Sequence, residues 1–344
     1  MTEAVLAIDV GSGTQDILLY LPGKNLENCP KMVMPSQTQI VAQRIRQVTV
    51  EGRDLFLSGV VMGGGASTVA LKAHLQAGLK AYATPAAAKT FHDNLENVKA
   101  LGVEMVEENP GDAFEVRLGD LDLAGLRRAL EEFGLEFPKR LAVAVQDHGE
   151  TVVMSNREFR FRFWREFISG GGELDRLIYD RPPAYFTRMG ALQDLDPGCK
   201  VMDTGAAAVW GILSDPIAGA MRDKGLIALN IGNSHTLGLA IKGTRVLGLF
   251  EHHTGQINPG FLLEQVKKFQ AGDLTNQEVF GRGGHGAYLH PDFRGGFEFV
   301  ALTGPRWAMA RDFGFYRAAP FGDMMLTGCF GLLAAMGLIS MDKG

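Results

Sequence analysis

The sequence predicts an α/β protein built of two lobes, with a ligand cleft between them. A chain of 344 residues with 46% hydrophobic content is long enough to bury two cores of ordinary size. Both halves begin with a pair of strands joined by a polar turn that contains glycine, and both continue into alternating helices and strands. This internal likeness indicates a duplication. We place the lobes at residues 1–197 and 198–344, because proline and turn residues accumulate just before this boundary.

The first half opens with apolar runs at 4–8 and 17–20, joined by a polar turn, which together predict a β-hairpin. Two glycines in the turn allow backbone N–H groups to face one point, and its hydroxyl and carboxylate side chains suit phosphate oxygens and Mg²⁺. The turn therefore predicts a nucleotide-phosphate cradle, made of Gly11, Ser12, Gly13 and Thr14 with Asp9 beside them. Alternatively, these residues serve hairpin geometry alone, and Asp16 pairs within the hairpin instead of binding metal.

Alternating strands and helices are expected to complete the first lobe. Glycines at 63–65 precede an expected helix, so they indicate either an anion site at a helix N-terminus or close packing of strand and helix. Thr84 and Pro85 supply a cap and a first-turn residue for the helix after them. The strands are expected at 31–35, 39–50, 55–62, 103–106 and 141–145, and the helices at 68–77, 86–101 and 121–133.

Composition excludes several classes of function. The net charge is −5 and no long basic block is present, so we expect neither nucleic-acid binding nor attraction to a membrane surface. Arginine and aromatic residues alternate at 157–167, which we interpret as an amphipathic segment that shields its rings rather than as a nucleic-acid site. No apolar stretch has the length of a membrane span, and no export signal opens the sequence. Three widely spaced cysteines also favour a reducing compartment, so we expect a cytoplasmic protein.

The second half repeats the opening pattern. Its first strand ends at Asp203-Thr204-Gly205, from which an alanine-rich helix is expected to run to Leu213. A polar loop at 230–234 then joins two strands and mirrors the N-terminal turn. Further strands are expected at 226–229, 236–241, 245–250 and 297–302, and further helices at 260–270, 305–311 and 323–336.

Three segments together resemble the superfamily of sugar kinases, seventy-kilodalton heat-shock chaperones and actin. Asp9 to Thr14 is similar to its first phosphate loop, Asn230 to Thr236 to its second, and Phe299 to Gly304 to its adenosine segment. The resemblance implies two ribonuclease-H-like lobes, the duplicated actin-like ATPase fold, closing over ATP and Mg²⁺ in a central cleft. It also implies that Gly232, Asn233 and Ser234 hold the far side of the phosphates, and that Thr303 and Gly304 lie near adenosine. Pro305 departs from the usual pair of glycines.

Two more segments resemble the xylulose and glycerol type of carbohydrate kinase. Val143 to Gly149 is similar to the strand that ends near the substrate in those enzymes, which implies substrate contacts by Gln146, Asp147 and His148. Asp203 and the alanines after it are similar to the segment that carries the catalytic aspartate, which implies that Asp203 is the general base. The alternatives are an ordinary turn at 146–149 and a helix cap at Asp203.

The chain is most similar to a prokaryotic branch of this superfamily whose members are sometimes labelled as related to pyruvate formate-lyase activation. That label implies radical chemistry on an iron–sulfur cluster held by closely spaced cysteines, whereas Cys29, Cys199 and Cys329 are far apart in the sequence. We therefore set the chemistry of the label aside.

These resemblances predict an ATP-dependent phosphotransferase that acts on a small hydroxylated substrate. The alternative is a nucleotide-dependent regulatory ATPase that closes its lobes and is recognised by a protein partner. A third hypothesis, an iron–sulfur activator, would use Cys199 or Cys329 at a dimer interface. The histidines at 252, 253, 285 and 290, with Glu251, invite a metal site, but neighbouring histidines on a strand point to opposite faces, so we expect packed or solvated histidines.

Overall fold

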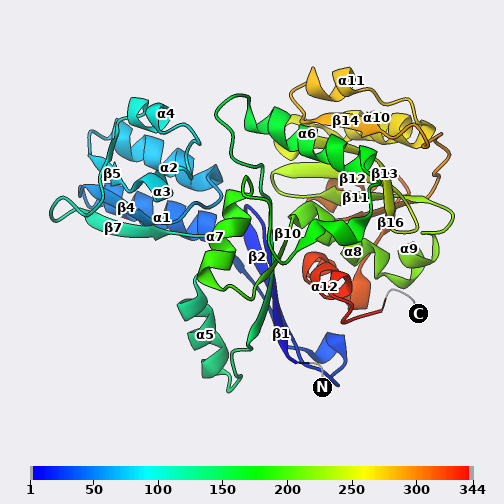
Figure 1. Cartoon of the computed structure of the whole chain (residues 1–344), viewed down its shortest axis with the longest axis horizontal. Coiled ribbons are helices and arrows are strands. Elements are labelled where there is room, and N and C mark those ends of the chain that lie inside the picture. Colours follow the sequence, from blue (N-terminus) through cyan, green and yellow to red (C-terminus); the bar gives the residue numbers. More distant parts are fainter. Residues whose placement is uncertain (1–2, 341–344) are drawn as a thin grey trace.

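The computed structural model describes residues 3–340 and has two six-stranded sheets that share the same order over five strands (Figure 1). In the first sheet, β1, β2 and β3 are antiparallel, whereas β1, β8 and β10 are parallel. In the second sheet, β11, β12 and β13 are antiparallel, whereas β11, β15 and β16 are parallel. This repeated order is that of a duplicated ribonuclease-H-like lobe. The predicted α/β class and actin-like ATPase fold are therefore confirmed.

The strands of the two sheets agree largely with the sequence expectations. The first sheet consists of β3 (Lys31–Pro35), β2 (Thr14–Tyr20), β1 (Val5–Val10), β8 (Arg140–Val145), β10 (Lys200–Met202) and β9 (Ile178–Tyr179). The second consists of β14 (Gly286–Leu289), β13 (Arg245–His253), β12 (His235–Lys242), β11 (Leu226–Ile231), β15 (Val300–Thr303) and β16 (Tyr316–Arg317). Although β10 follows residue 197, it pairs with β8 in the first sheet, so the strand pairing of the first lobe extends beyond the boundary that we expected.

A third, parallel sheet forms a small unit inserted between β3 and β8, drawn in blue and cyan in Figure 1. It consists of β6 (Val103–Met105), β5 (Ala81–Ala83), β4 (Leu55–Gly59) and β7 (Phe114–Leu118). Its helices are α1 (Gln37–Val50), α2 (Gly65–Gln76), α3 (Pro85–Ala88) and α4 (Leu95–Ala100). This unit has its own buried core, which the prediction of two lobes did not include.

Three expected elements of the sequence analysis are wrong. The strand expected at 39–50 is helix α1, because Val41, Ile45 and Val48 recur at helical spacing and are all buried. The helix expected at 86–101 is two short helices, since Asn94 caps a new helix α4 there. The helix expected at 305–311 is only a 3₁₀ turn, Trp307–Ala310.

The remaining helices surround and connect the two large sheets. They are α5 (Leu123–Glu132), α6 (Asn156–Ser169), α7 (Thr187–Leu195), α8 (Thr204–Leu213), α9 (Pro216–Ala220), α10 (Pro259–Ala271), α11 (Asn276–Phe280) and α12 (Thr327–Ala335). Helix α8 packs on α12, and one continuous core includes both helices and residues of both sheets. The contact is close, because a Cβ on Gly331 would overlap the carbonyl oxygen of Ala207.

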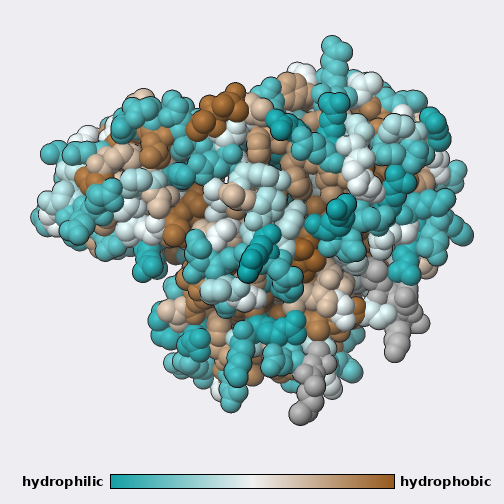
Figure 2. Space-filling model, viewed as in Figure 1, coloured by the Kyte–Doolittle hydropathy of each residue, from teal (hydrophilic) through white to brown (hydrophobic). Residues whose placement is uncertain are grey.

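The surface is mostly polar on the face shown in Figure 2, where apolar side chains are scattered in small groups among hydrophilic ones. Among the helices of residues 3–340, none is long and apolar enough to span a membrane. The segment that alternates arginine with aromatic residues is helix α6, and its Arg160, Trp164 and Ile168 are buried at helical spacing. It is therefore amphipathic, as expected.

Candidate functional site

The two predicted phosphate loops lie against each other. In the first loop, the Gly11 N–H donates to the Thr14 carbonyl at 2.8 Å, which closes the tight turn between β1 and β2. In the second, the Gly232 N–H donates to the His235 carbonyl at 2.9 Å between β11 and β12. The hydroxyls of Ser234 and Ser12 are joined by a hydrogen bond of 2.7 Å. Loops from the two halves of the sequence therefore share one cleft, as the duplication predicts.

On one side of the loops is a cavity of about 80 Å³, which reaches Asp9, Asp16 and Gly304. Asp9 and Asp16 are register partners on β1 and β2. Within residues 3–340, the Oδ1 atom of each carboxylate is buried without a hydrogen-bond partner. Burial raises the pKa of Asp16 to about 7, and burial together with the charge of Asp16 raises the pKa of Asp9 well above its usual range. Two carboxylates that each keep one oxygen without a partner, beside hydroxyl groups, are a donor set that fits Mg²⁺.

Gly304 and Thr303 lie at the end of β15, at the edge of this cavity. Gly304 has a φ of +103°, and a Cβ there would lie 2.5 Å from the Ile231 carbonyl oxygen, so only glycine lets the chain pass so close to β11. The Thr303 hydroxyl donates to Thr327 at 3.0 Å and so faces helix α12. The structure thus brings the expected adenosine segment to the same cleft as both phosphate loops.

A larger cavity of about 310 Å³ opens on the other side of the loops. The small unit contributes Gly63 to Gly65 and Lys89 to its wall, and α6 and α7 contribute Arg160 and Arg188. The Lys89 ammonium pairs with Glu150 at 2.7 Å. A cavity of this size, with several charged side chains, could hold a small polar molecule.

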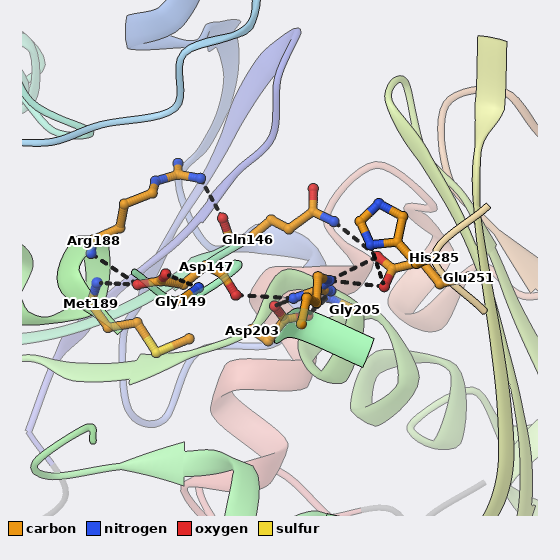
Figure 3. A network of polar contacts seen from close by, with 10 residues as sticks. Gln146, Asp147, Gly149, Arg188, Met189, Asp203, Gly205, Glu251 and His285 are labelled. Carbon is orange, nitrogen blue, oxygen red and sulfur yellow. Dashed lines mark hydrogen bonds and ion pairs between the residues drawn. The ribbon is translucent and has the colours of Figure 1, made fainter. Parts of the chain in front are cut away.

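Arg160 is the centre of a buried ion network that sequence reasoning missed, part of which is drawn in Figure 3. Its guanidinium donates to Asp203 at 2.7 Å and to Glu251 at 2.8 Å, and all three residues are buried. Burial alone would raise the pKa of Glu251, but the charge of Arg160 outweighs it and holds that pKa well below its usual range. One signal was available: Arg160 lies on the apolar face of an amphipathic helix, where a buried guanidinium needs carboxylate partners.

Asp203 caps helix α8, and its Oδ1 accepts the Gly205 N–H at 2.9 Å. This confirms the capping alternative. Its two oxygens also accept from Arg160. Because both oxygens are taken up by these partners, the structure gives Asp203 a positioning role, and the general-base role stays a prediction.

The substrate residues predicted at the end of β8 have three different environments. Gln146 donates to Glu251 at 3.0 Å. Asp147 is buried and accepts the backbone N–H groups of Gly149, Arg188 and Met189, so it fixes the start of helix α7 (Figure 3). The Arg188 side chain pairs with Asp120 at 2.7 Å and also donates to the Gln146 carbonyl. Asp147 thus acts as a turn residue, and Gln146, Asp147 and His148 all border the larger cavity.

His148 lies among other histidines. Its ring is 5.4 Å from that of His235 and 5.3 Å from that of His285. Burial lowers the pKa of His235 to about 3 and that of His285 to about 4, so these imidazoles are neutral at pH 7.

The cysteines do not fit an iron–sulfur cluster shared between two chains. Cys29, Cys199 and Cys329 are all buried. Burial raises the pKa of Cys199 to about 12 and that of Cys329 well above its usual range, so neither is a ready thiolate ligand. A cluster at a dimer interface needs thiolates at the surface, so this third hypothesis is not supported.

A family described as "Putative pyruvate format-lyase activating enzyme (DUF1786)" matches residues 62–309. No curated protein matches the chain. Among solved structures, the chain is similar to the activator of 2-hydroxyisocaproyl-CoA dehydratase from Clostridium difficile with bound ADPNP, at 11% identity and a TM-score of 0.33, over 97% of this chain and 95% of that one. It is also similar to the ethanolamine utilization protein EutJ from Carboxydothermus hydrogenoformans, at 11% identity and a TM-score of 0.36, over 96% and 89% of the two chains.

Proposed function

The chain belongs to the DUF1786 family, and we propose that it binds Mg²⁺–ATP between its two phosphate loops and transfers the γ-phosphate to a small hydroxylated molecule. One observation carries the proposal. The paired loops separate a cavity lined by unpaired carboxylates from a larger polar cavity of about 310 Å³. Phosphoryl transfer needs this layout, in which donor and acceptor lie on opposite sides of the phosphate groups.

Each loop has a defined role in this proposal. The N–H groups of Gly11 and Gly232 close the two turns, so the backbone N–H groups of Ser12 and Gly13 hold one side of the phosphates and those of Asn233 and Ser234 hold the other. Asp9 and Asp16 would hold Mg²⁺, which neutralises phosphate charge when it is bound. Arg160, fixed by Asp203 and Glu251, forms part of the wall of the acceptor cavity.

Nucleotide binding requires the cleft to open. The cavity beside Asp9 has a volume of only about 80 Å³, whereas ligand pockets usually have roughly 300–1,000 Å³. The Ser12–Ser234 hydrogen bond joins the two loops across this entrance. We expect nucleotide to separate these two hydroxyls and to replace their contact with phosphate oxygens.

The test is nucleotide affinity in a variant that adds one negative charge to the second loop. The exposed Asn233 lies against Gly13, and Asn233→Asp keeps its shape. We expect at least a tenfold loss of Mg²⁺–ATP affinity by calorimetry, because one added charge repels phosphate by about 1.4 kcal/mol or more. Asn25→Asp, an exposed site remote in sequence from both loops, is the matched control and should bind like wild type. Equal affinity in the two variants would refute the phosphate site.

Transfer is tested separately by ADP release during a screen of sugars and polyols. Stimulation by one acceptor supports the phosphotransferase. ATP binding, or slow hydrolysis, that no acceptor stimulates would refute the transfer step and favour the nucleotide-dependent regulatory ATPase.

A further inference from the structure

Three histidines from separate elements converge beside the second phosphate loop. His148 follows β8, His235 begins β12 and His285 precedes β14. One ring nitrogen of each can be chosen so that all three lie within 4.8 Å of one another. The neighbouring pair His252 and His253, which suggested a metal site in the sequence, is outside this set, as is His290, whereas His285 belongs to it.

The ring nitrogens of two histidines of this cluster lack hydrogen-bond partners. Within residues 3–340, both nitrogens of His235 and both of His285 are buried without a hydrogen bond. Buried polar atoms are normally paired. The nitrogens of His252 are also unpaired, but only those of His235 and His285 belong to a group of three histidines with ligand atoms within 4.8 Å, and this convergence points to a missing ligand. Neutral imidazole is the form of histidine that ligates metals.

A carboxylate lies beside the cluster. Glu251 is the carboxylate whose charge acts on both His235 and His285, while Arg160 and Arg157 oppose it at His285. Glu251 Oε2 lies 3.7 Å from His285 Nδ1. A carboxylate behind a histidine is the usual arrangement that orients a metal-ligating imidazole.

We propose that His148, His235 and His285 bind one divalent transition-metal ion of the zinc class. Tetrahedral zinc with bonds of about 2.1 Å needs nitrogens roughly 3.4 Å apart, so modest ring rotations close the site from the 4.8 Å limit. His148 and His235 also line the cavity of about 310 Å³, so the fourth position faces it and can accept water or an oxygen of a bound molecule. The ion would link the loop that follows β8 in the first sheet to the second sheet, and it would hold the two sides of the cleft together.

The test uses tag-free, chelator-stripped protein without nucleotide. We expect calorimetry with Zn²⁺ to give one site per chain, metal analysis after desalting to give one Zn²⁺, and Co²⁺ to produce the visible bands of a tetrahedral site. His235→Gln and His285→Ala should each lower Zn²⁺ affinity by at least about 100-fold. The matched control is His252→Gln, because His252 lies on the same β13 strand as Glu251 but outside the cluster. It should retain the affinity of wild type.

A wild-type chain that binds no Zn²⁺ and gives no Co²⁺ bands overturns the proposal even where the variants fail to fold. Zn²⁺ binding that is equal in His235→Gln and wild type also overturns it. Zn²⁺ should raise the melting temperature of wild type but not of His235→Gln, since only an ion bound to the folded state stabilises it. Because no nucleotide is present, these results are independent of the proposed phosphate site.

Discussion

Replacing Asp16 by asparagine should change how the stability of the protein depends on pH. Asp16 is buried on β2 opposite Asp9, and its Oδ1 has no partner among residues 3–340. Burial raises its pKa from 3.8 to about 7, although a hydrogen bond from Thr14 lowers that pKa in part. Asparagine has nearly the same shape and never ionises, so the variant removes this titration, together with the charge that helps to raise the pKa of Asp9.

The direction and size of this change in stability follow from proton linkage. Between pH 3.8 and about 7 the folded state holds a proton on Asp16 that the unfolded state has lost, so stability falls as pH rises. The slope is about 1.4 kcal/mol per pH unit, which gives about 4 kcal/mol in total and about 2 kcal/mol between pH 5.5 and pH 8. Over that interval, Asp16→Asn should therefore gain about 2 kcal/mol in free energy of unfolding relative to wild type.

The assay is urea unfolding followed by circular dichroism at both pH values, with divalent cations removed. Asp112→Asn, at an exposed carboxylate, is the control and should show the same difference from wild type at both pH values. The reasoning is refuted if the difference between Asp16→Asn and wild type is also independent of pH. Adding Mg²⁺ at pH 8 should then stabilise wild type more than Asp16→Asn, because the ion compensates the ionised carboxylate.

Two further substitutions test the packing around the cleft. Arg160→Gln should lower the free energy of unfolding in urea by about 3–5 kcal/mol, because it leaves two buried carboxylates without their ion-pair partner. Arg162→Gln, on the exposed face of the same helix, should lower it by less than about 1 kcal/mol. Equal losses in the two variants would contradict the buried network. Gly331→Ala should lower the melting temperature, because its Cβ would overlap the Ala207 carbonyl oxygen. Gly190→Ala in α7, where the space around the Cβ is open, should instead stabilise the protein by about 0.5–1 kcal/mol. A Gly331→Ala variant as stable as wild type would mean that α8 and α12 are not in this close contact.

The duplicated hairpins could be predicted from the sequence because their signal is local. Apolar runs flank a glycine-containing turn at Asp9 to Asp16 and again at Asn230 to Thr236, and each hairpin pairs two strands that are adjacent in the sequence. Local residues also explain why the sequence predicts a strand at 39–50. Its β-branched residues favour a strand, but the buried positions follow a helical spacing through Ile45 and Val48, so tertiary packing outweighs the β-propensity of the segment.

The ion network and the histidine cluster could not be predicted, because their members are brought together only by the packing of the two lobes. The sequence groups Glu251 with the histidines beside it, but it does not indicate Arg160 as the partner, because only the packing of β13 against α6 brings the two together. His148 and His285 are 137 positions apart in the sequence. Single residues of this kind leave no periodic pattern in the sequence, unlike the glycine turns.

The energies of the contacts between the lobes indicate where the cleft can open. At the entrance, the two loops are joined by the exposed Ser12–Ser234 hydrogen bond, which contributes about 1 kcal/mol. At the base, α8 and α12 lie within one core that includes Trp210, Phe330 and residues of both sheets. Exposing even one such large buried side chain costs about 1.5–3 kcal/mol. The Gln146–Glu251 hydrogen bond also joins the two sheets at the cleft, and it adds a contribution of similar size. Breaking these two contacts is less costly than separation at the base, so the lobes should rotate about α8 and α12 when nucleotide enters.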